Sequence, residues 1–392
     1  MLKLNKIFHK GGVGSDVFED RIAPPSERRK YLMVCKNKIR DHLKPLIRSA
    51  TKEVLGMERV VEPRFRTQGS WSYDTCIDPA FTPPQEMDWD YGIYLPVTVW
   101  EENGPPHKMA QAYFGLVESF LGSLCKQEGW TLLPGKETCI RVKVASWAHI
   151  DLPLYAAPED EFKNIRERVS LEEAQLKKAF DSVTASYNFA EEALIEQQQW
   201  EDLNHVVMAT RKGEWMSSDP EVVAKWFRDR VDEHGEQLRR VCRYLKAWRD
   251  FHWQQGGPTS VSIMIATVHG FDCKPGRDDL AIEHAAKHLS TAFLHDLREL
   301  GIDNRAEDFN RLNEAERLQA GSRFGQLAME LQSARSLGSH QKDQALFKLK
   351  QLFGSRMPTD TVLVELDNGV DAIRATMPSR VPPPVVPSTK AG

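Results

Sequence analysis

Hydrophobic residues recur at a helical spacing in some parts of the chain and alternate with polar residues in others. Glu27–Leu55 has the helical spacing, which predicts an amphipathic helix that Pro45 kinks or divides into two. A second helix is expected over Lys108–Gln127, where one face is apolar. Alternation with a period of two predicts three strands, over Met87–Val97, Thr138–Ser146 and Ala148–Ala156. The first half of the chain is therefore expected to form a mixed α+β unit.

After Pro158 the hydrophobic spacing becomes helical. Ser218 or Asp219 can cap a helix whose first turn contains Pro220, and this helix is expected to run to about Trp253. Further helices are expected over Thr259–Phe271, Asp278–Leu300 and Asn310–Phe353. The second half is thus predicted to be mostly helical.

These patterns divide the chain into four regions. We expect an irregular N-terminal arm over residues 1–27, then an α+β core with a bracing N-terminal helix over residues 28–215. A helical lobe is expected over residues 216–376, and a flexible tail over residues 377–392. The tail contains five prolines, a composition typical of an extended, polyproline-like segment.

The composition is that of a globular protein with two domains. With 392 residues, 41% of them hydrophobic and 28% charged, the chain can form two cores and is too hydrophobic to be wholly disordered. We find no apolar stretch of the ~20 residues that a membrane span needs, no signal-peptide pattern, and six cysteines too scattered for a disulfide framework. The net charge of −4 argues against stable nucleic-acid binding. We expect a soluble, cytoplasmic protein without a membrane partner.

Three aspartates on the predicted strands form the main candidate site. Asp88 and Asp90 stand two residues apart, so both carboxylates project from one face of their strand, and Asp151 occupies another strand. Such carboxylates repel one another unless cations neutralise them, and three on adjacent strands can bridge two Mg²⁺ ions. The alternative for an isolated pair of this kind is the solvated face of an edge strand.

Gly69 and Ser70 shift the balance toward a nucleotide site. A Gly-Ser pair that opens a helix lets a phosphate approach the backbone, where free N–H groups and the hydroxyl can hold its oxygens. Here 17 residues separate the pair from Asp88, and the third aspartate follows about 60 residues after Asp90. This is the signature layout of the DNA polymerase β-like nucleotidyltransferases.

Longer blocks of sequence resemble one family within that superfamily. In chain order they are TQGSWSYDT, PPQEMDWDYGIYLP, HIDLPLYAAP, SDPEVVAKWF, CRYLKAWRD and GGPTSVSIMIATV. They lie within about Arg64–Val268 and are similar to the bacterial cGAS/DncV-like nucleotidyltransferases (CD-NTases), most of all to their cyclic GMP-AMP synthase branch. The resemblance implies an α+β fold, in which a polymerase β-like core (a mixed sheet with helices) packs on a mostly helical C-terminal lobe.

The resemblance also implies roles for individual residues. Asp88, Asp90 and Asp151 resemble the catalytic triad that binds two Mg²⁺ ions. The residues that resemble nucleotide-binding positions are Gln68, Gly69 and Ser70 in the phosphate-holding turn, Tyr73 on a base, and Lys246 and Ser260 at the donor triphosphate. The alternatives are a core aromatic for Tyr73 and a surface lysine for Lys246.

Spacing adds two cations to this set. Arg141 and Lys143 share one face of their strand beside Asp151, where they would offset triphosphate charge; two solvated cations on an exposed strand are the alternative. The family's base-selecting carboxylate has no clear counterpart, and Asp303 and Asp308 are the candidates. Arg66 departs from the aromatic residue that this branch carries there.

The function implied by the resemblance is the Mg²⁺-dependent synthesis of 3′,3′-cyclic GMP-AMP from ATP and GTP. That product would be a second messenger for a cyclic-nucleotide-activated effector in anti-phage (CBASS) defence. Three alternatives remain: a different cyclic di- or trinucleotide, a linear nucleotidyl transfer to RNA, and a catalytically silent partner-binding module. The net charge of −4 counts against the second, and the presence of all three aspartates counts against the third.

The tail suggests one further partner. Many operons of this family encode an E1/E2-like protein that conjugates the cyclase through its C-terminus. A flexible tail that ends in Gly392 would offer an unhindered carboxylate to such an enzyme. An inert linker is the alternative interpretation.

Overall fold

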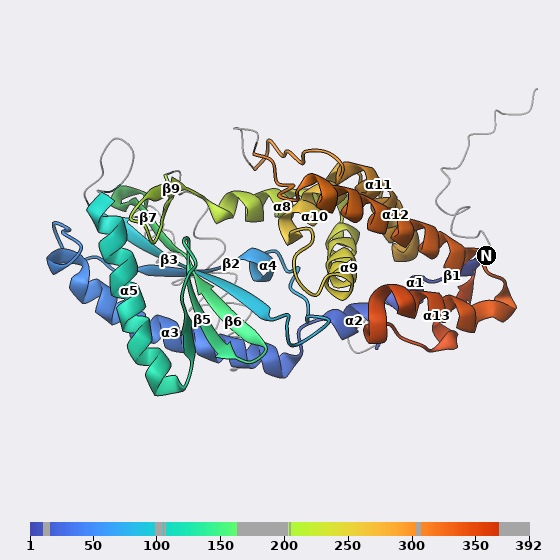
Figure 1. Cartoon of the computed structure of the whole chain (residues 1–392), viewed down its shortest axis with the longest axis horizontal. Coiled ribbons are helices and arrows are strands. Elements are labelled where there is room, and N and C mark those ends of the chain that lie inside the picture. Colours follow the sequence, from blue (N-terminus) through green and yellow to red (C-terminus); the bar gives the residue numbers. More distant parts are fainter. Residues whose placement is uncertain are drawn as a thin grey trace, which may run out of the picture.

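The structure of the protein, a computed structural model, describes residues 1–10, 16–98, 105, 107–162, 203, 205–302 and 307–367. Two lobes follow one another along the long axis of the molecule: a twisted sheet with helices, and a group of helices (Figure 1). This architecture confirms the predicted α+β fold, in which a mixed sheet with helices packs on a mostly helical lobe. Among the described helices, none is long and apolar enough to cross a membrane.

A mixed sheet of eight described strands forms the first lobe, in the order β4-β5-β6-β3-β7-β8-β9 with β2 paired to β3. The strands are β2 (Arg64–Gln68), β3 (Met87–Val97), β4 (Thr131–Leu133), β5 (Ile140–Ala145), β6 (Ala148–Leu152), β7 (Leu154–Pro158), β8 (Val207–Ala209) and β9 (Trp215–Ser217). The central strand β3 pairs in parallel with β6 and β7 and antiparallel with β2. The strand predicted over Ala148–Ala156 is divided at Pro153, which has no N–H to donate to the ladder.

Two long helices, α3 (Ser26–Glu53) and α5 (His107–Glu128), share a hydrophobic core with this sheet. α3 runs through Pro45 as one helix, so of the two expected outcomes, a kink or a division into two helices, the division does not occur. Pro45 is exposed, and water on that face can satisfy the carbonyl group that the missing N–H leaves free. α3 therefore covers the core of the sheet as a single element.

The helical lobe is built mainly from six helices in the second half of the described chain. They are α8 (Pro220–His234), α9 (Glu236–His252), α10 (Ser260–His269), α11 (Asp278–Ala292), α12 (Glu314–Ser336) and α13 (Lys342–Phe353). Asp219, one of the two predicted caps, caps α8 by accepting a hydrogen bond from the backbone N–H of Glu221. The helix expected to run on to Trp253 is divided at Gly235, whose φ of +82° a helix cannot accommodate.

The expectation of an irregular N-terminal arm is wrong for its described part. β1 (Leu2–Lys3), α1 (Asn5–Phe8) and α2 (Phe18–Ile22) pack into the core of the helical lobe. β1 pairs antiparallel with β10 (Glu365–Leu366), the last described strand. Each of these elements is too short to show a period in the sequence, and its conformation depends on tertiary contacts. Three short 3₁₀ turns, η1 (Ser339–Gln341), η2 (Gly354–Arg356) and η3 (Thr361–Leu363), complete the lobe.

Candidate active site

A cavity of about 550 Å³ lies between the two lobes. From the sheet side it is lined by Gln68, Gly69, Ser70, Tyr73, Asp88, Asp90 and Asp151, and from the helical lobe by Lys246 and Ser260. The structure therefore gathers most of the predicted site residues, from segments far apart in the sequence, around one space. Arg141, Lys143 and Asp308 are not among the residues that line it.

The register of the sheet brings the three aspartates together. β3 and β6 run in parallel, with Asp90 opposite Asp151 and Asp88 opposite His149. The alternate residues of β3, Met87, Trp89 and Tyr91, are buried in the core, as the period of two predicted. The carboxylates of the two strands therefore face the cavity side by side.

Asp90 and Asp151 lie opposite each other, but their pKa values are shifted in opposite directions. Burial, together with the carboxylates of Asp88 and Asp151, raises the pKa of Asp90 to about 8. Burial alone would raise the pKa of Asp151 too, but Arg141 and Lys136 outweigh it and hold that pKa below its usual value. Asp90 is thus a buried acid that needs a nearby positive charge in order to ionise.

Gly69 is required where the turn meets Asp90. Gln68, the last residue of β2, lies opposite Asp90, and α4 (Gly69–Ser72) begins directly after it. Gly69 has a φ of +62°, and a Cβ added there would lie 2.1 Å from Asp90 Oδ2. Only glycine fits this conformation and this contact. The Gly-Ser turn and Asp90 therefore form one unit.

Gly69→Ala is expected to reduce turnover by about 100-fold, because it displaces the Asp90 carboxylate from its position. Gly56→Ala is the matched control: Gly56 also has a positive φ, of +69°, but nothing lies within 4 Å of the added Cβ. Release of pyrophosphate, the leaving group of the nucleotidyl transfer that the sequence resemblance implies, measures turnover, and a thermal melt reports folding. Equal losses of activity in the two variants would mean that backbone strain, and not contact with Asp90, is responsible.

The side chains of Gln68 and Tyr73, both predicted to bind nucleotide, make contacts within the protein. The Gln68 amide donates a hydrogen bond to the Tyr94 hydroxyl at 2.6 Å and accepts one from Tyr155 at 3.4 Å. Tyr73 is only 8% exposed and its ring meets that of Phe227 edge-on, with centroids 6.3 Å apart. The alternative of a core aromatic therefore describes most of the Tyr73 ring, although the residue borders the cavity.

Lys246 is not a surface lysine. It is 4% exposed and its ammonium group donates to the backbone carbonyl of Thr75 at 2.6 Å. Burial lowers its pKa to about 8. Ser260 begins α10 on the same wall of the cavity and accepts a hydrogen bond from Arg249 at 3.3 Å. Both residues lie where an anion in the cavity would meet them.

Arg141 and Lys143 share the half-buried face of β5, as predicted, but contact different carboxylates. The Arg141 guanidinium donates two hydrogen bonds of 2.6 Å to Asp151. Lys143 pairs with Glu86. Lys136, which the sequence interpretation missed, donates to Asp151 at 2.7 Å. These cations therefore act on the carboxylates of the site.

The remaining predicted residues lie elsewhere. Asp308 accepts hydrogen bonds from the backbone N–H groups of Leu297 and Asn310, at 2.8 and 2.9 Å, and pairs with Arg317 at 2.6 Å. Its carboxylate holds a loop of the helical lobe away from the cavity, so nothing in its contacts supports the predicted role in nucleotide binding, which stays a prediction. Asp303 and Gly392 lie outside the described residues.

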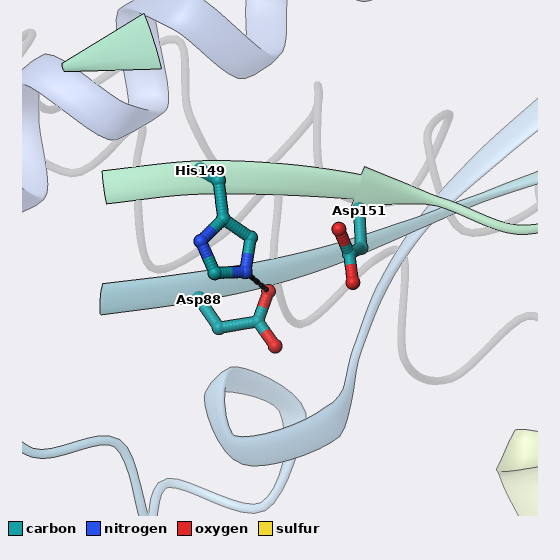
Figure 2. Close-up of side chains that lie close together, drawn as sticks. All are labelled: Asp88, His149 and Asp151. Carbon is teal, nitrogen blue, oxygen red and sulfur yellow. Dashed lines mark ion pairs between the residues drawn. The ribbon is translucent and has the colours of Figure 1, made fainter. Parts of the chain in front are cut away.

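His149 and Glu86 are further polar residues that the sequence interpretation missed. Figure 2 shows the His149 ring directed at Asp88, with Asp151 on the same side of the strands; Nε2 lies 3.0 Å from Asp88 Oδ1. Nδ1 lies 2.9 Å from Glu86 Oε2. Burial alone would lower the pKa of His149, but Asp88 outweighs it and raises that pKa. His149 precedes Asp151 by two residues, so the period of two already placed both on one face.

The donor set fits a divalent cation. Asp88, Asp90 and Asp151 offer carboxylate oxygens around one part of the cavity, and oxygen is the donor that Mg²⁺ prefers. The pKa of Asp90 is raised first by burial and then by the carboxylates of Asp88 and Asp151, and a bound cation would offset both effects. These three residues are therefore the ones that would hold metal.

The fold and the site together define a nucleotidyltransferase of the polymerase β-like class. Two aspartates lie on the central strand of a mixed sheet and a third on its parallel neighbour, beside a Gly-Ser turn and opposite a helical lobe. Two family models match the chain. They describe the nucleotidyltransferase domain of DncV-like cyclic GMP-AMP synthases, over residues 63–155, and the C-terminal domain of cyclic GMP-AMP synthase, over residues 235–366.

Relatives and solved structures agree with these matches. The chain is 35% identical over 350 residues to a cyclic GMP-AMP synthase of Vibrio cholerae serotype O1, covering 87% of this chain and 77% of that protein. It is 32% identical over 339 residues to an Escherichia coli cyclic GMP-AMP synthase, covering 83% and 74% of the two chains. The chain belongs to the family of DncV-like cyclic GMP-AMP synthases.

Solved structures of Vibrio cholerae DncV share the whole architecture. One, in complex with the linear intermediate 5′ pppA(3′,5′)pG, has a TM-score of 0.72 and 27% identity, covering 94% of this chain and 99% of that one. A DncV variant in complex with ATP, GTP and 5MTHFGLU2 has a TM-score of 0.74 and 27% identity, covering 94% and 100%. The polymerase β-like core and the helical lobe are thus confirmed together.

Proposed function

We propose that this protein joins ATP and GTP into 3′,3′-cyclic GMP-AMP in a Mg²⁺-dependent reaction. The observation that carries the proposal is the meeting of Asp88, Asp90 and Asp151 with the Gly-Ser turn in a cavity shared by both lobes. Family membership supports the same reaction, because the related proteins are cyclic GMP-AMP synthases and one DncV structure holds ATP and GTP. The cavity of about 550 Å³ lies within the usual size range of a small-molecule site.

The reaction consists of two attacks of a 3′-hydroxyl on an α-phosphate. In the first, one nucleotide attacks the other, pyrophosphate leaves and a linear dinucleotide triphosphate forms. In the second, the remaining 3′-hydroxyl attacks the remaining α-phosphate, a second pyrophosphate leaves and the ring closes. When bound, two Mg²⁺ ions would lower the pKa of the attacking hydroxyl and neutralise the leaving pyrophosphate.

Residues of the chain would prepare the site for these steps. Arg141 and Lys136 hold Asp151 ionised and fix its orientation through three hydrogen bonds of 2.6 to 2.7 Å. Gly69 lets the turn approach Asp90, so that phosphate oxygens can reach backbone N–H groups beside the carboxylates. Lys246 would place a positive charge on the opposite wall, where it can meet the triphosphate.

Product analysis tests the proposal directly. The purified protein is incubated with all four NTPs and Mg²⁺, and products are identified by mass spectrometry after nuclease digestion that establishes the linkages. Cyclic GMP-AMP with two 3′,5′ linkages is the expected product. A different cyclic product would keep the catalytic site and reassign the bases, whereas a linear product or none would contradict the proposed reaction.

Lys246→Met tests the role of the helical wall. We expect the KM for ATP and GTP to rise at least 10-fold, because a charge-assisted hydrogen bond to phosphate contributes about 1.5–3 kcal/mol. The same change should stabilise the nucleotide-free protein, since the pKa of about 8 shows that burial disfavours the ammonium ion. The cost of burying the charged ammonium group is complete below pH 8 and disappears above pH 10.5, the ordinary pKa of lysine. The extra stability of the variant against urea unfolding should therefore shrink between pH 8 and 10.5. An unchanged KM would contradict the assigned role.

The wider setting of the reaction is also proposed on the basis of family membership. The product would act as a second messenger for an effector in anti-phage defence, in the cytoplasm. An E1/E2-like protein would conjugate the chain through Gly392, which mass spectrometry of the protein after incubation with that enzyme would detect. Gly392→Glu should prevent the adduct without changing the cyclic product.

A further inference from the structure

His149 occupies a position from which it faces the metal-binding aspartates. It lies on β6, two residues before Asp151, and opposite Asp88 in the parallel pair. Its side chain is 8% exposed, and the ring points at Asp88 along the direction shown in Figure 2. A buried imidazole among carboxylates needs a partner for each of its two nitrogens.

The first nitrogen has a well-defined partner. Nδ1 lies 2.9 Å from Glu86 Oε2, and Lys143 pairs with the other oxygen of Glu86. Because a carboxylate accepts and cannot donate, Nδ1 carries the hydrogen. In a neutral ring this leaves the Nε2 lone pair free to bind a cation, and Glu86, held by Lys143, fixes the direction in which that lone pair points.

The second nitrogen lacks a good hydrogen bond. His149 Nε2 and Asp88 Oδ1 are 3.0 Å apart, yet both are buried atoms without a properly angled hydrogen-bond partner among the described residues. One ring nitrogen of His149 and one oxygen each of Asp88 and Asp151 lie within 4.8 Å of one another. A proton on Nε2 would pair the two atoms when no ion is present, and a metal ion bound to both would take its place.

Asp151 remains available to such an ion although Arg141 and Lys136 contact it. A carboxylate offers about four lone-pair positions, and these two cations use three hydrogen bonds. The arrangement of carboxylate, histidine and metal, in which the histidine gives its other N–H to a carboxylate, recurs in protein metal centres. Glu86, His149 and Asp88 have the chemistry and the spacing for it.

We propose that His149 Nε2 is a ligand of one of the two metal ions, together with Asp88 and Asp151. Mg²⁺ selects oxygen ligands, whereas imidazole increases the affinity for first-row transition metals. This metal position therefore favours Mn²⁺ over Mg²⁺. Glu86 is a positioning residue, because it acts on the metal through His149. The inference deepens the proposed function and rests on it for the use of the metal in the reaction, but not for the binding of the metal.

The test is electron spin-echo envelope modulation on the purified protein loaded with half an equivalent of Mn²⁺. Nucleotide is left out, because the base nitrogens would add modulation of their own. We expect the nitrogen-14 modulation of a coordinated imidazole in the native protein. We expect it to be absent in His149→Gln and retained in His269→Gln, a change at a partly exposed histidine of the helical lobe.

A titration of the free Mn²⁺ signal supplies the affinity. Glu86→Gln should weaken Mn²⁺ binding by about 10- to 100-fold while keeping the nitrogen modulation, because the second partner of a ligating histidine contributes in this range. His149→Gln should lower the ratio of kcat/KM with Mn²⁺ to that with Mg²⁺ by about 10-fold or more. Thermal melts confirm that each variant is folded.

The outcomes separate the two proposals. Mn²⁺ bound by the native protein without nitrogen modulation would overturn the inference, whatever the variants do, and would indicate that a protonated His149 pairs with Asp88 instead. Absence of cyclic product with either metal would overturn the proposed function, and the spectrum of bound Mn²⁺ would still decide the ligand.

Discussion

Replacing Asp88 and Asp90 together with asparagine will abolish cyclic dinucleotide synthesis and leave the protein folded. Asparagine keeps the size of each side chain but removes the charge that holds a divalent cation. Because Asp90 is buried beside two further carboxylates, its loss removes repulsion and should not destabilise the sheet. Mass spectrometry of the products measures the loss, and a thermal melt the fold. Residual product above background would refute the metal assignment.

The single change Asp90→Asn adds a stability measurement to this prediction. The pKa of Asp90 is about 8 in the folded protein against an ordinary 3.8, so the protonated acid is the form that the fold accepts. Below about pH 4 Asp90 is protonated in both the folded and the unfolded chain, so it does not reduce the stability of the fold. Between pH 4 and 8 only the unfolded chain ionises at this residue, so the folded protein loses stability as the pH rises. In EDTA, the variant should therefore gain stability relative to the native protein between pH 4 and 8. Mg²⁺ should reduce the difference, and a difference independent of pH would contradict the assignment.

Asp278→Ala will destabilise the protein by about 3–5 kcal/mol, the usual cost of leaving a buried ion pair without one partner. Asp278 is fully buried, and Arg240 donates two hydrogen bonds to its carboxylate, at 2.7 and 2.9 Å. Gln237 and Tyr244 donate two more, at 2.8 and 3.2 Å. The substitution would leave the Arg240 guanidinium paired with nothing that the structure shows, at the centre of the helical lobe.

Urea unfolding at neutral pH measures this loss, with Asp272→Ala as the matched control. Asp272 lies in the same lobe and pairs with Lys274, but its side chain is 49% exposed, so its removal should cost less than about 1 kcal/mol. Burial alone would raise the pKa of Asp278, but the ion pair with Arg240 and the hydrogen bond from Gln237 hold that pKa below 3.8. The ion pair should therefore stabilise the fold down to about pH 4. Similar losses in the two variants would show that burial of the pair is not what matters.

The sequence predicted those elements whose period is long and regular. The strands β3 and β5 and the helices α3 and α5 follow directly from alternation and from apolar spacing, and Asp219, one of two predicted caps, starts α8. The third predicted strand is present as two, β6 and β7. The division at Gly235 was not foreseen, because a glycine within a helical pattern is compatible with either outcome until its φ is known. The N-terminal elements were missed because their conformation depends on partners more than two hundred residues away.

The site could be predicted as far as its side chains belong to strands. Asp88, Asp90 and Asp151 were placed correctly because the period of two fixes the face of each residue, and the Gly-Ser turn because its spacing to them is characteristic. Register decides the rest: nothing in the sequence states that Asp88 lies opposite His149, so the histidine went unnoticed. Asp308 was a candidate because the family carries a base-selecting carboxylate late in the helical lobe, and in the structure its carboxylate accepts hydrogen bonds from backbone N–H groups.

The interleaving of the two lobes in the sequence determines the order in which they are made. α1 and α2 supply Phe8 and Phe18 to the core of the helical lobe, but the whole sheet lobe, from α3 to β9, lies between them and α8. During synthesis on the ribosome, the sheet lobe can therefore fold before the helices that pack against Phe8 and Phe18 have been made. β1 acquires its neighbour only when β10 emerges. The last residue that lines the nucleotide cleft is Met264, so a nascent chain that ends before α8 has only the sheet wall of the cleft and cannot carry out the reaction.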